Sequence, residues 1–198
     1  MTLENGFHDV PLGKVATVVT HLEMDAPVPA KSVSPPQGWT MQAVPNPEAD
    51  WYRALYRDVG SDWLWFSRLQ MPKAELTAIL QHPAVEVYSL RQGDVDGGIV
   101  ELDFREEGRC ELAFFGLTSA LIGKGAGRYM MNFALETAWA HPIRQLYIHT
   151  CTLDSPQALS FYKRSGFVPV RQQIEIADDP RVLGIFDDSK APHVPIFR

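Results

Sequence analysis

Hydrophobic and polar positions follow two periods along this chain, and each period predicts a class of element. The β-branched, partly alternating run 13–24 predicts a strand, and a shorter strand is predicted near 39–44. Apolar positions three and four residues apart then predict helical stretches around 51–56, 62–69 and 73–80. Pro72 separates the last two stretches, because a helix interior excludes proline.

From Val85 onward the period becomes two, and glycine-rich turns separate the apolar runs. This pattern predicts three strands of an antiparallel meander, at 85–90, 99–104 and 110–117. The chain then continues into a predicted helix at 125–141, a strand at 144–151, a short helix at 156–165 and a strand at 168–176. Ser155 is expected to cap the short helix and Gly166 to end it. We therefore expect a mixed α/β domain with a mostly antiparallel sheet flanked by helices.

Length and composition fit one globular unit with limited choices of partner. The chain has 198 residues, 45% of them hydrophobic, which suits a single domain. A net charge of -6 argues against nucleic acid, and no apolar run approaches the roughly 20 residues of a membrane helix. Cys110 and Cys151 lie in predicted strands and are expected to be free thiols in a reducing compartment. The cytoplasm is the expected location.

Proline content divides the expected domain, 1–198, into three parts. Four prolines between positions 26 and 37 predict a strap over the surface, so residues 1–37 form an N-terminal extension with one strand. Residues 38–177 form the core, and 178–198 form a tail that either adds an edge strand or packs on the surface. The N-terminal strand either completes the sheet or pairs with a second subunit, which leaves a homodimer open.

A glycine-rich segment before the helix at 125–141 is the first candidate for chemistry. Gly123, Gly125 and Gly127 stand at every second position, so several backbone amides can converge where the helix dipole adds positive charge. A pyrophosphate fits such a cradle. The spacing is not that of a Walker loop, and Arg128 stands where a dinucleotide fingerprint needs glycine. A glycine-rich turn without a ligand remains the alternative.

The segment downstream of this loop favours a phosphate-binding loop over a glycine-rich turn without a ligand. The order of strand, glycine loop, helix, strand and a final motif resembles the GCN5-related N-acetyltransferase (GNAT) superfamily over roughly residues 38–177. The pyrophosphate motif of that superfamily, Gln/Arg-x-x-Gly-x-Gly/Ala, maps onto 122–127, followed by the basic Arg128. The final motif maps onto Ser155, Ala158, Tyr162, Gly166 and Phe167.

Four positions depart from the pattern of the superfamily. Ile122 stands where relatives usually carry Gln or Arg, which leaves only backbone contacts to phosphate. Ser155 stands where relatives usually carry Asn, so its hydroxyl, or Asp154 beside it, would meet the pantetheine arm. Ser119 replaces a usual proline, and Thr150 stands where some relatives place a glutamate.

The resemblance implies direct transfer of acetyl from acetyl-CoA to an amine, through a tetrahedral intermediate and without a metal. It implies that a backbone N–H near Leu117 polarises the thioester carbonyl and that Tyr162 protonates the departing thiolate. It also implies cofactor contacts at Leu117, Thr118, Ile122, Gly123, Lys124, Gly125, Ala126, Gly127, Arg128, Ser155 and Tyr162. The cationic side chains that could neutralise CoA phosphates are Lys124, Arg128, Lys163 and Arg164.

The base that deprotonates the amine stays open at this stage. Glu111 has the parity of Ala113, Phe115 and Leu117, so without a bulge it faces the acetyl site, and we take it as the first candidate. His149 or a chain of water molecules are the alternatives. A solvated carboxylate at the sheet edge is an equally simple explanation of Glu111.

The acceptor is expected to be a small-molecule amine or a peptide or protein amine. In this superfamily the early helices shape the acceptor pocket, and here they carry Trp51, Tyr52, Tyr56, Trp63, Trp65 and Phe66. Rings that line a pocket would favour an acceptor with an apolar or cationic body. The competing hypotheses are a catalytically weak or inactive acyl-CoA-binding module of the same fold and a nucleotide-binding enzyme.

Overall fold

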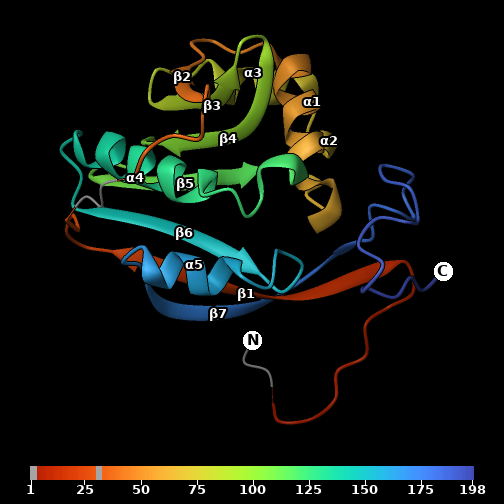
Figure 1. Ribbon diagram of the computed structural model, residues 1–198. Helices are drawn as coiled ribbons and strands as arrows, with labels where there is room; N and C mark the ends of the chain where they lie inside the picture. Colours follow the sequence, from red (N-terminus) through yellow and green to blue (C-terminus); the bar gives the residue numbers. More distant parts are fainter. Residues whose placement is uncertain (1–3, 30–32) are drawn as a thin grey trace.

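The computed structural model describes residues 4–29 and 33–198, which form a seven-stranded sheet with helices on both faces (Figure 1). The strands are β1 (Lys14–Met24), β2 (Thr40–Ala43), β3 (Val85–Gln92), β4 (Val95–Asp103), β5 (Arg109–Leu117), β6 (Gln145–Cys151) and β7 (Val168–Asp178). Their order across the sheet is β2-β3-β4-β5-β6-β1-β7. Only β5 and β6 pair in parallel, so the predicted mixed, mostly antiparallel sheet is confirmed.

Helices cover both faces because the central strands bury side chains on each side. The helices are α1 (Ala49–Gly60), η1 (Ser61–Trp63), α2 (Ser67–Gln70), α3 (Lys73–Leu80), η2 (Ser119–Leu121), α4 (Ala126–Trp139) and α5 (Ala158–Arg164). In β4, Ile99 packs in a cluster with Tyr52 of α1, while its neighbour Val100 packs with Met130 of α4. Alternation along the strand thus places two cores on opposite faces of one sheet.

The N-terminal strand completes the sheet of its own chain. β1 lies between β6 and β7 and pairs antiparallel with both. The expected strap at 26–37 includes residues 30–32, which lie outside the described residues; Val28 in its first part packs against the core beneath α4 and α5. Residues 179–198 of the tail, all of them described, form no strand, and Phe186 and Ala191 pack instead beside Leu64 and Leu153.

The helix predicted at 62–69 is broken into two short pieces. Leu64 adopts a left-handed backbone conformation with φ 54°, which ends η1 before α2 begins at Ser67. Its side chain is buried in the cluster that the tail completes. A left-handed leucine costs roughly 1–2 kcal/mol, so burial of this side chain outweighs the local preference.

The parallel strands β5 and β6 pair over a short distance only and then diverge. Three residue pairs join them, from Arg109 with Gln145 to Glu111 with Tyr147. Beyond these pairs β5 continues to Leu117 beside β4, and β6 continues to Cys151 beside β1. The gap between the diverging strands is therefore not closed by main-chain hydrogen bonds, and it positions the site described below.

Both cysteines are free thiols, with Cys110 buried in β5 and Cys151 half-buried at the end of β6. Burial raises the pKa of the Cys110 thiol, which keeps it protonated and unreactive. Within residues 4–29 and 33–198, no helix combines the length and the apolar character needed to cross a membrane.

Candidate active site

A cleft of about 720 Å³ opens where β5 and β6 diverge. One end of the cleft is aromatic and is built by α1, η1 and the start of α2. The other end is formed by the glycine loop and α5. The cleft is therefore lined by both sequence motifs and by the early helices, and it spans from one face of the sheet to the other.

The glycine loop presents backbone donors without acceptors. Gly123 and Gly125 have φ of 81° and 82°, the left-handed region that favours glycine, and no side chain caps α4 at Gly125. Among the described residues, the amides of Gly123, Gly125, Ala126 and Gly127 donate to no acceptor. A Cβ built at Gly123 or Gly125 would meet no atom within 4 Å. Free amides at the start of a helix fit a diphosphate.

The other cofactor positions differ in their surroundings. The side chain of Ile122 is exposed and lines the cleft together with Leu117 and Arg128. Thr118 does not line the cleft, because its amide and hydroxyl both donate to the Gly97 carbonyl, at 2.9 and 3.2 Å. Lys124 is exposed beside the loop and lies outside the lining.

Tyr162 lies in α5 with only 7% of its surface exposed, and it lines the cleft. Its ring meets Phe115 and Phe167 edge-on, with centroids 6.3 and 6.2 Å apart. Within the described residues its hydroxyl has no hydrogen-bond partner. Burial, and next the negative charge of Asp154, raise the pKa of Tyr162, so the hydroxyl stays protonated. A hydroxyl that lines a cleft and has no protein partner can donate to a ligand atom.

The helix that carries Tyr162 starts later than the sequence predicts and ends where the sequence predicts. It was predicted from Pro156 with Ser155 as its cap, but α5 starts at Ala158, and Ser155 lies in the preceding turn with its hydroxyl 3.4 Å from the Gln157 amide. The predicted stop at Gly166 is confirmed. The amide of Phe167 donates to the Tyr162 carbonyl and that of Gly166 to Lys163, a Schellman motif that needs the φ of 108° at Gly166.

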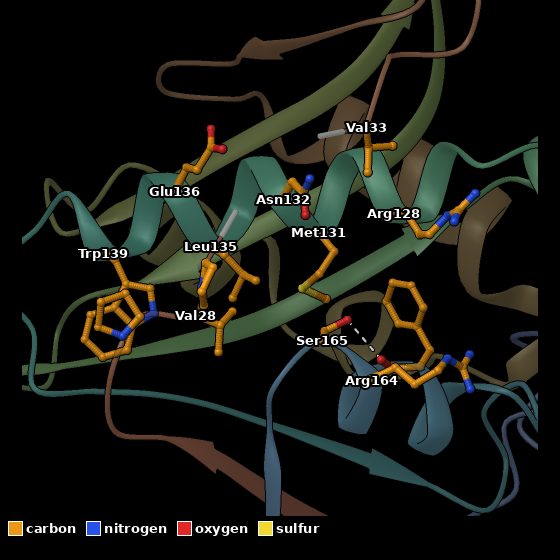
Figure 2. A pocket seen from close by; sticks show the side chains of 13 residues that line it. Val28, Val33, Arg128, Met131, Asn132, Leu135, Glu136, Trp139, Arg164 and Ser165 are labelled. Carbon is orange, nitrogen blue, oxygen red and sulfur yellow. Dashed lines mark hydrogen bonds between the residues drawn. The ribbon is translucent and has the colours of Figure 1, made fainter. Parts of the chain in front are cut away.

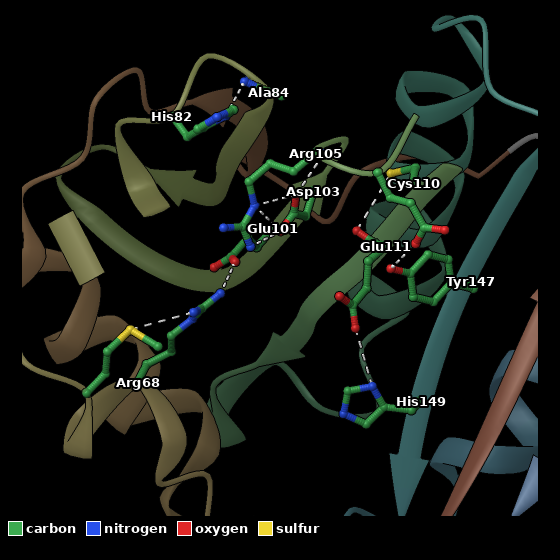
Figure 3. A network of polar contacts seen from close by, with 12 residues as sticks. Arg68, His82, Ala84, Glu101, Asp103, Arg105, Cys110, Glu111, Tyr147 and His149 are labelled. Carbon is green, nitrogen blue, oxygen red and sulfur yellow. Dashed lines mark hydrogen bonds and ion pairs between the residues drawn. The ribbon is translucent and has the colours of Figure 1, made fainter. Parts of the chain in front are cut away.

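The expected parity of Glu111 is wrong, because β5 contains a bulge. Phe114 pairs with Glu101 and Leu112 pairs with Leu102, so Ala113 is an extra residue in β5. The faces exchange at that point, and Glu111 does not line the cleft. Its Oε1 instead lies 3.4 Å from Nδ1 of His149, which does line the cleft (Figure 3). The hydrogen bond to Glu111 raises the pKa of His149, whereas burial of the ring lowers it.

Two side chains bridge the aromatic end of the cleft to the loop after β6. Nε1 of Trp65 donates to Oδ1 of Asp154 at 3.0 Å. Oδ2 of Asp154 accepts from the Thr150 hydroxyl at 2.7 Å and from the Cys151 amide at 2.9 Å. The motif drew attention to Asp154 through its neighbour Ser155, but nothing local to the sequence indicated the contact with Trp65.

A second groove of about 410 Å³ lies between α4, α5 and the described residues 27–29 and 33 of the strap (Figure 2). Val28 and Val33 approach it from the strap, and Trp139 lies at its far end. Arg128 and Arg164 line both this groove and the cleft. The two cavities thus share a cationic border beside the glycine loop.

Known proteins share this sequence pattern and this fold. Residues 50–167 match the Acetyltransferase (GNAT) family. Over 76 residues the chain is 32% identical to the mycothiol acetyltransferase of Jonesia denitrificans, a stretch that covers 37% of this chain and 23% of that protein. The chain therefore spans about a quarter of that relative.

Solved structures agree at the level of the fold. A GCN5-related N-acetyltransferase from Sphaerobacter thermophilus superposes with a TM-score of 0.59 and 16% identity, over 85% of this chain and 53% of that one. A GCN5-related N-acetyltransferase from Kribbella flavida gives a TM-score of 0.54 and 16% identity, over 85% and 60%. With the family match over more than half of its length, the chain belongs to the GNAT family of acetyltransferases.

Proposed function

We propose that this acetyltransferase moves the acetyl group of acetyl-CoA directly to a primary amine of a small molecule or peptide. One observation carries the proposal: a single cleft joins the free amides at the start of α4 to the unpartnered hydroxyl of Tyr162. When bound, acetyl-CoA supplies the acetyl group as a thioester. The family match supports acetyl transfer in general, and the free thiols fit the expected cytoplasmic location.

Each part of the cleft has a distinct task in this proposal. The amides of the glycine loop hold the diphosphate, and Arg128 and Arg164 add positive charge beside them. The backbone near Leu117, where β5 has left β6, polarises the thioester carbonyl. The Tyr162 hydroxyl donates a hydrogen bond to the sulfur as it leaves.

His149 is the group that we propose as the base, with Glu111 as its positioning residue. An amine with the pKa of lysine must lose a proton at a cost of about 4.6 kcal/mol at pH 7, so a base near neutral pKa helps. The Glu111 carboxylate on Nδ1 orients the ring and leaves Nε2 to accept the proton.

Calorimetry with acetyl-CoA, together with release of CoA thiol from a panel of amines, tests the function. Heat of binding and thiol release with at least one amine are expected. The departures at Ile122, Thr150 and Ser155 favour a second candidate, an acyl-CoA-binding module without turnover. Binding without thiol release from any amine would support that candidate. Binding of ATP or NAD in place of acetyl-CoA would contradict both.

We expect Gly125→Ala to weaken acetyl-CoA binding by about tenfold, since a left-handed alanine costs roughly 1–2 kcal/mol and a shift of the loop relieves it. Gly93→Ala is the matched control. Gly93 has φ of 58° with open space around a Cβ, lies in the turn between β3 and β4, and does not line the cleft. Calorimetric dissociation constants should change in the first variant only; equal affinity in both variants would remove the loop from the proposed site.

Activity should rise with pH as His149 loses its proton, and Glu111→Gln should move this acid limb to lower pH. The direction follows because the hydrogen bond to Glu111 is the main cause that raises the pKa of His149. The pH dependence of kcat/KM measures it. Glu86→Gln is the control, since Glu86 pairs with His141 at 3.1 Å away from the cleft. An unmoved limb in Glu111→Gln would reject the assignment.

A further inference from the structure

The end of the cleft opposite the glycine loop is aromatic and acidic. The rings that line it belong to Tyr56, Trp63, Trp65, Phe66 and Phe114. The cationic residues that line the cleft, Arg128 and Arg164, both lie at the other end, near the loop. The acidic lining residues are the half-buried Asp154 and the exposed Glu175. Opposite charges therefore separate along the cleft, whereas aromatic rings also line its other end, where Phe115, Phe161 and Tyr162 lie.

Asp154 keeps one position for a further donor. A carboxylate offers about four lone-pair sites, two on each oxygen. Oδ2 accepts from Thr150 and Cys151, and Oδ1 accepts from Trp65 alone among the described residues. The site that remains is on the oxygen beside the Trp65 indole. An ammonium there would pair with the carboxylate, and the other rings at this end of the cleft, among them Trp63 and Phe66, would contact the body of the amine.

Two features bring the indole of Trp65 to this place. Gly116 of β5 leaves room for it, since a Cβ there would lie 3.0 Å from the Trp65 ring. The ring also packs against Tyr56 and Phe114, with centroids 5.4 and 5.5 Å away. The ring is thus fixed before any acceptor arrives, which lowers the entropy cost of binding.

Resting on the proposed acetyl transfer, we infer that the acceptor is an amine that is cationic in solution and carries an aromatic or similarly flat apolar body. A carboxylate next to the amine is disfavoured, because it would lie near Asp154. The tail packs beside this end of the cleft, since Phe186 is buried in a cluster with Leu64 and Leu153, two residues that line the cleft.

Three amines test the inference in the thiol-release assay with acetyl-CoA. Phenethylamine is expected to exceed phenylalanine, which adds a carboxylate, and butylamine, which lacks the ring, by about tenfold or more in kcat/KM. Equal kcat/KM values for phenylalanine and phenethylamine would overturn the charge argument. Equal kcat/KM values for butylamine and phenethylamine would overturn the ring argument. Acetyl-CoA binding without reaction of phenethylamine would reject the acceptor class alone, whereas no acetyl-CoA binding would reject the proposed function.

Calorimetry without acetyl-CoA gives a second measurement. Phenethylammonium is expected to bind more tightly than phenethyl alcohol, and Asp154→Asn is expected to remove that difference. Trp63→Leu should weaken phenethylammonium binding, while Trp51→Leu should not, because Trp51 lies outside the lining and donates to Asp96. Equal binding of the amine and the alcohol to the unmodified protein would contradict the role of Asp154.

The free edge of the sheet carries a second, independent inference. β7 is an edge strand of 11 residues, and within the described part of the chain it pairs only with β1. Ile174 and Ile176 on one face of it are 51% and 52% exposed, beside the exposed Val18 of β1. A long edge strand that carries exposed apolar side chains can pair with another chain, and monomeric proteins usually prevent such pairing.

The charged side chains along this edge can pair with those on the same edge of a second copy of the chain. Antiparallel pairing of two copies about Gln173 places Arg171 opposite Glu175 of the partner subunit, twice by symmetry. Gln172 then lies opposite Ile174 of the partner subunit on the apolar face. The geometry points to a two-fold homodimer that joins the sheets of two copies of this chain through β7.

Light scattering after size exclusion tests the dimer. The unmodified chain is expected as a dimer at micromolar concentration, Arg171→Glu as a monomer, and the double variant Arg171→Glu with Glu175→Arg again as a dimer. Rescue by the double variant requires the two positions to meet. A monomeric unmodified chain, or a dimer that Arg171→Glu leaves intact, would overturn the pairing.

Discussion

Replacement of Tyr162 by phenylalanine is expected to lower kcat by about 100- to 10,000-fold, the range that a general acid contributes. The hydroxyl lines the cleft and has no partner among the described residues, so its removal leaves no polar group unpaired. The ring and its contacts with Phe115 and Phe167 stay in place. The free energy of unfolding should therefore change by less than about 1 kcal/mol.

Two measurements separate this role from a structural one. The dissociation constant of acetyl-CoA should stay near that of the unmodified protein, while kcat falls. Tyr88→Phe is the matched control: its hydroxyl donates to Glu86 at 2.7 Å outside the cleft, and turnover should be unchanged. Undiminished turnover in Tyr162→Phe would reject the acid role.

Arg68→Met is expected to destabilise the fold by about 3–5 kcal/mol, the usual cost of removing one partner from a buried ion pair. Glu101 in β4 has no exposed surface and is hydrogen-bonded by Arg68 and by the Tyr52 hydroxyl (Figure 3 shows the ion pair). Arg68 also lies over the Phe114 ring, 5.0 Å from its centre. Without the guanidinium, a carboxylate stays buried without a cation. Urea unfolding measures the loss.

The pH dependence and a double variant sharpen this second test. Burial raises the pKa of Glu101, and loss of Arg68 would raise it further, so the destabilisation should shrink as pH falls and the carboxyl becomes neutral. Arg68→Met with Glu101→Leu should recover much of the stability, because no buried charge remains. Lys73→Met at the exposed pair with Asp50 should leave the unfolding midpoint in place.

The ion pair also matters for the site, although it does not line the cleft. Arg68 belongs to α2, whose first residues border the aromatic end, and its pairing with Glu101 ties that helix to the sheet. A variant that weakens the pair between Arg68 and Glu101 should therefore lose selectivity among acceptor amines before it loses acetyl-CoA binding. Sequence patterns did not indicate this pair, since an Arg and a Glu 33 positions apart have no local signature.

Local sequence determined the features that depend on the backbone of a few neighbouring residues. Glycines at every second position predicted the donor loop, because glycine adopts the left-handed conformations found at Gly123 and Gly125. Gly166 predicted the end of α5 for the same reason. The change of hydrophobic period predicted the strands and the long helix, because these periods reflect which face of each element is buried.

Only the tertiary structure decided how the elements meet. The divergence of β5 from β6, the bulge at Ala113 and the place of β1 are matters of register between strands, which a run of residues does not encode. Because of the bulge, Glu111 contacts His149 and does not line the cleft. The contact of Trp65 with Asp154 joins positions 89 apart, and it exists because packing of the early helices on β5 carries the indole across the gap.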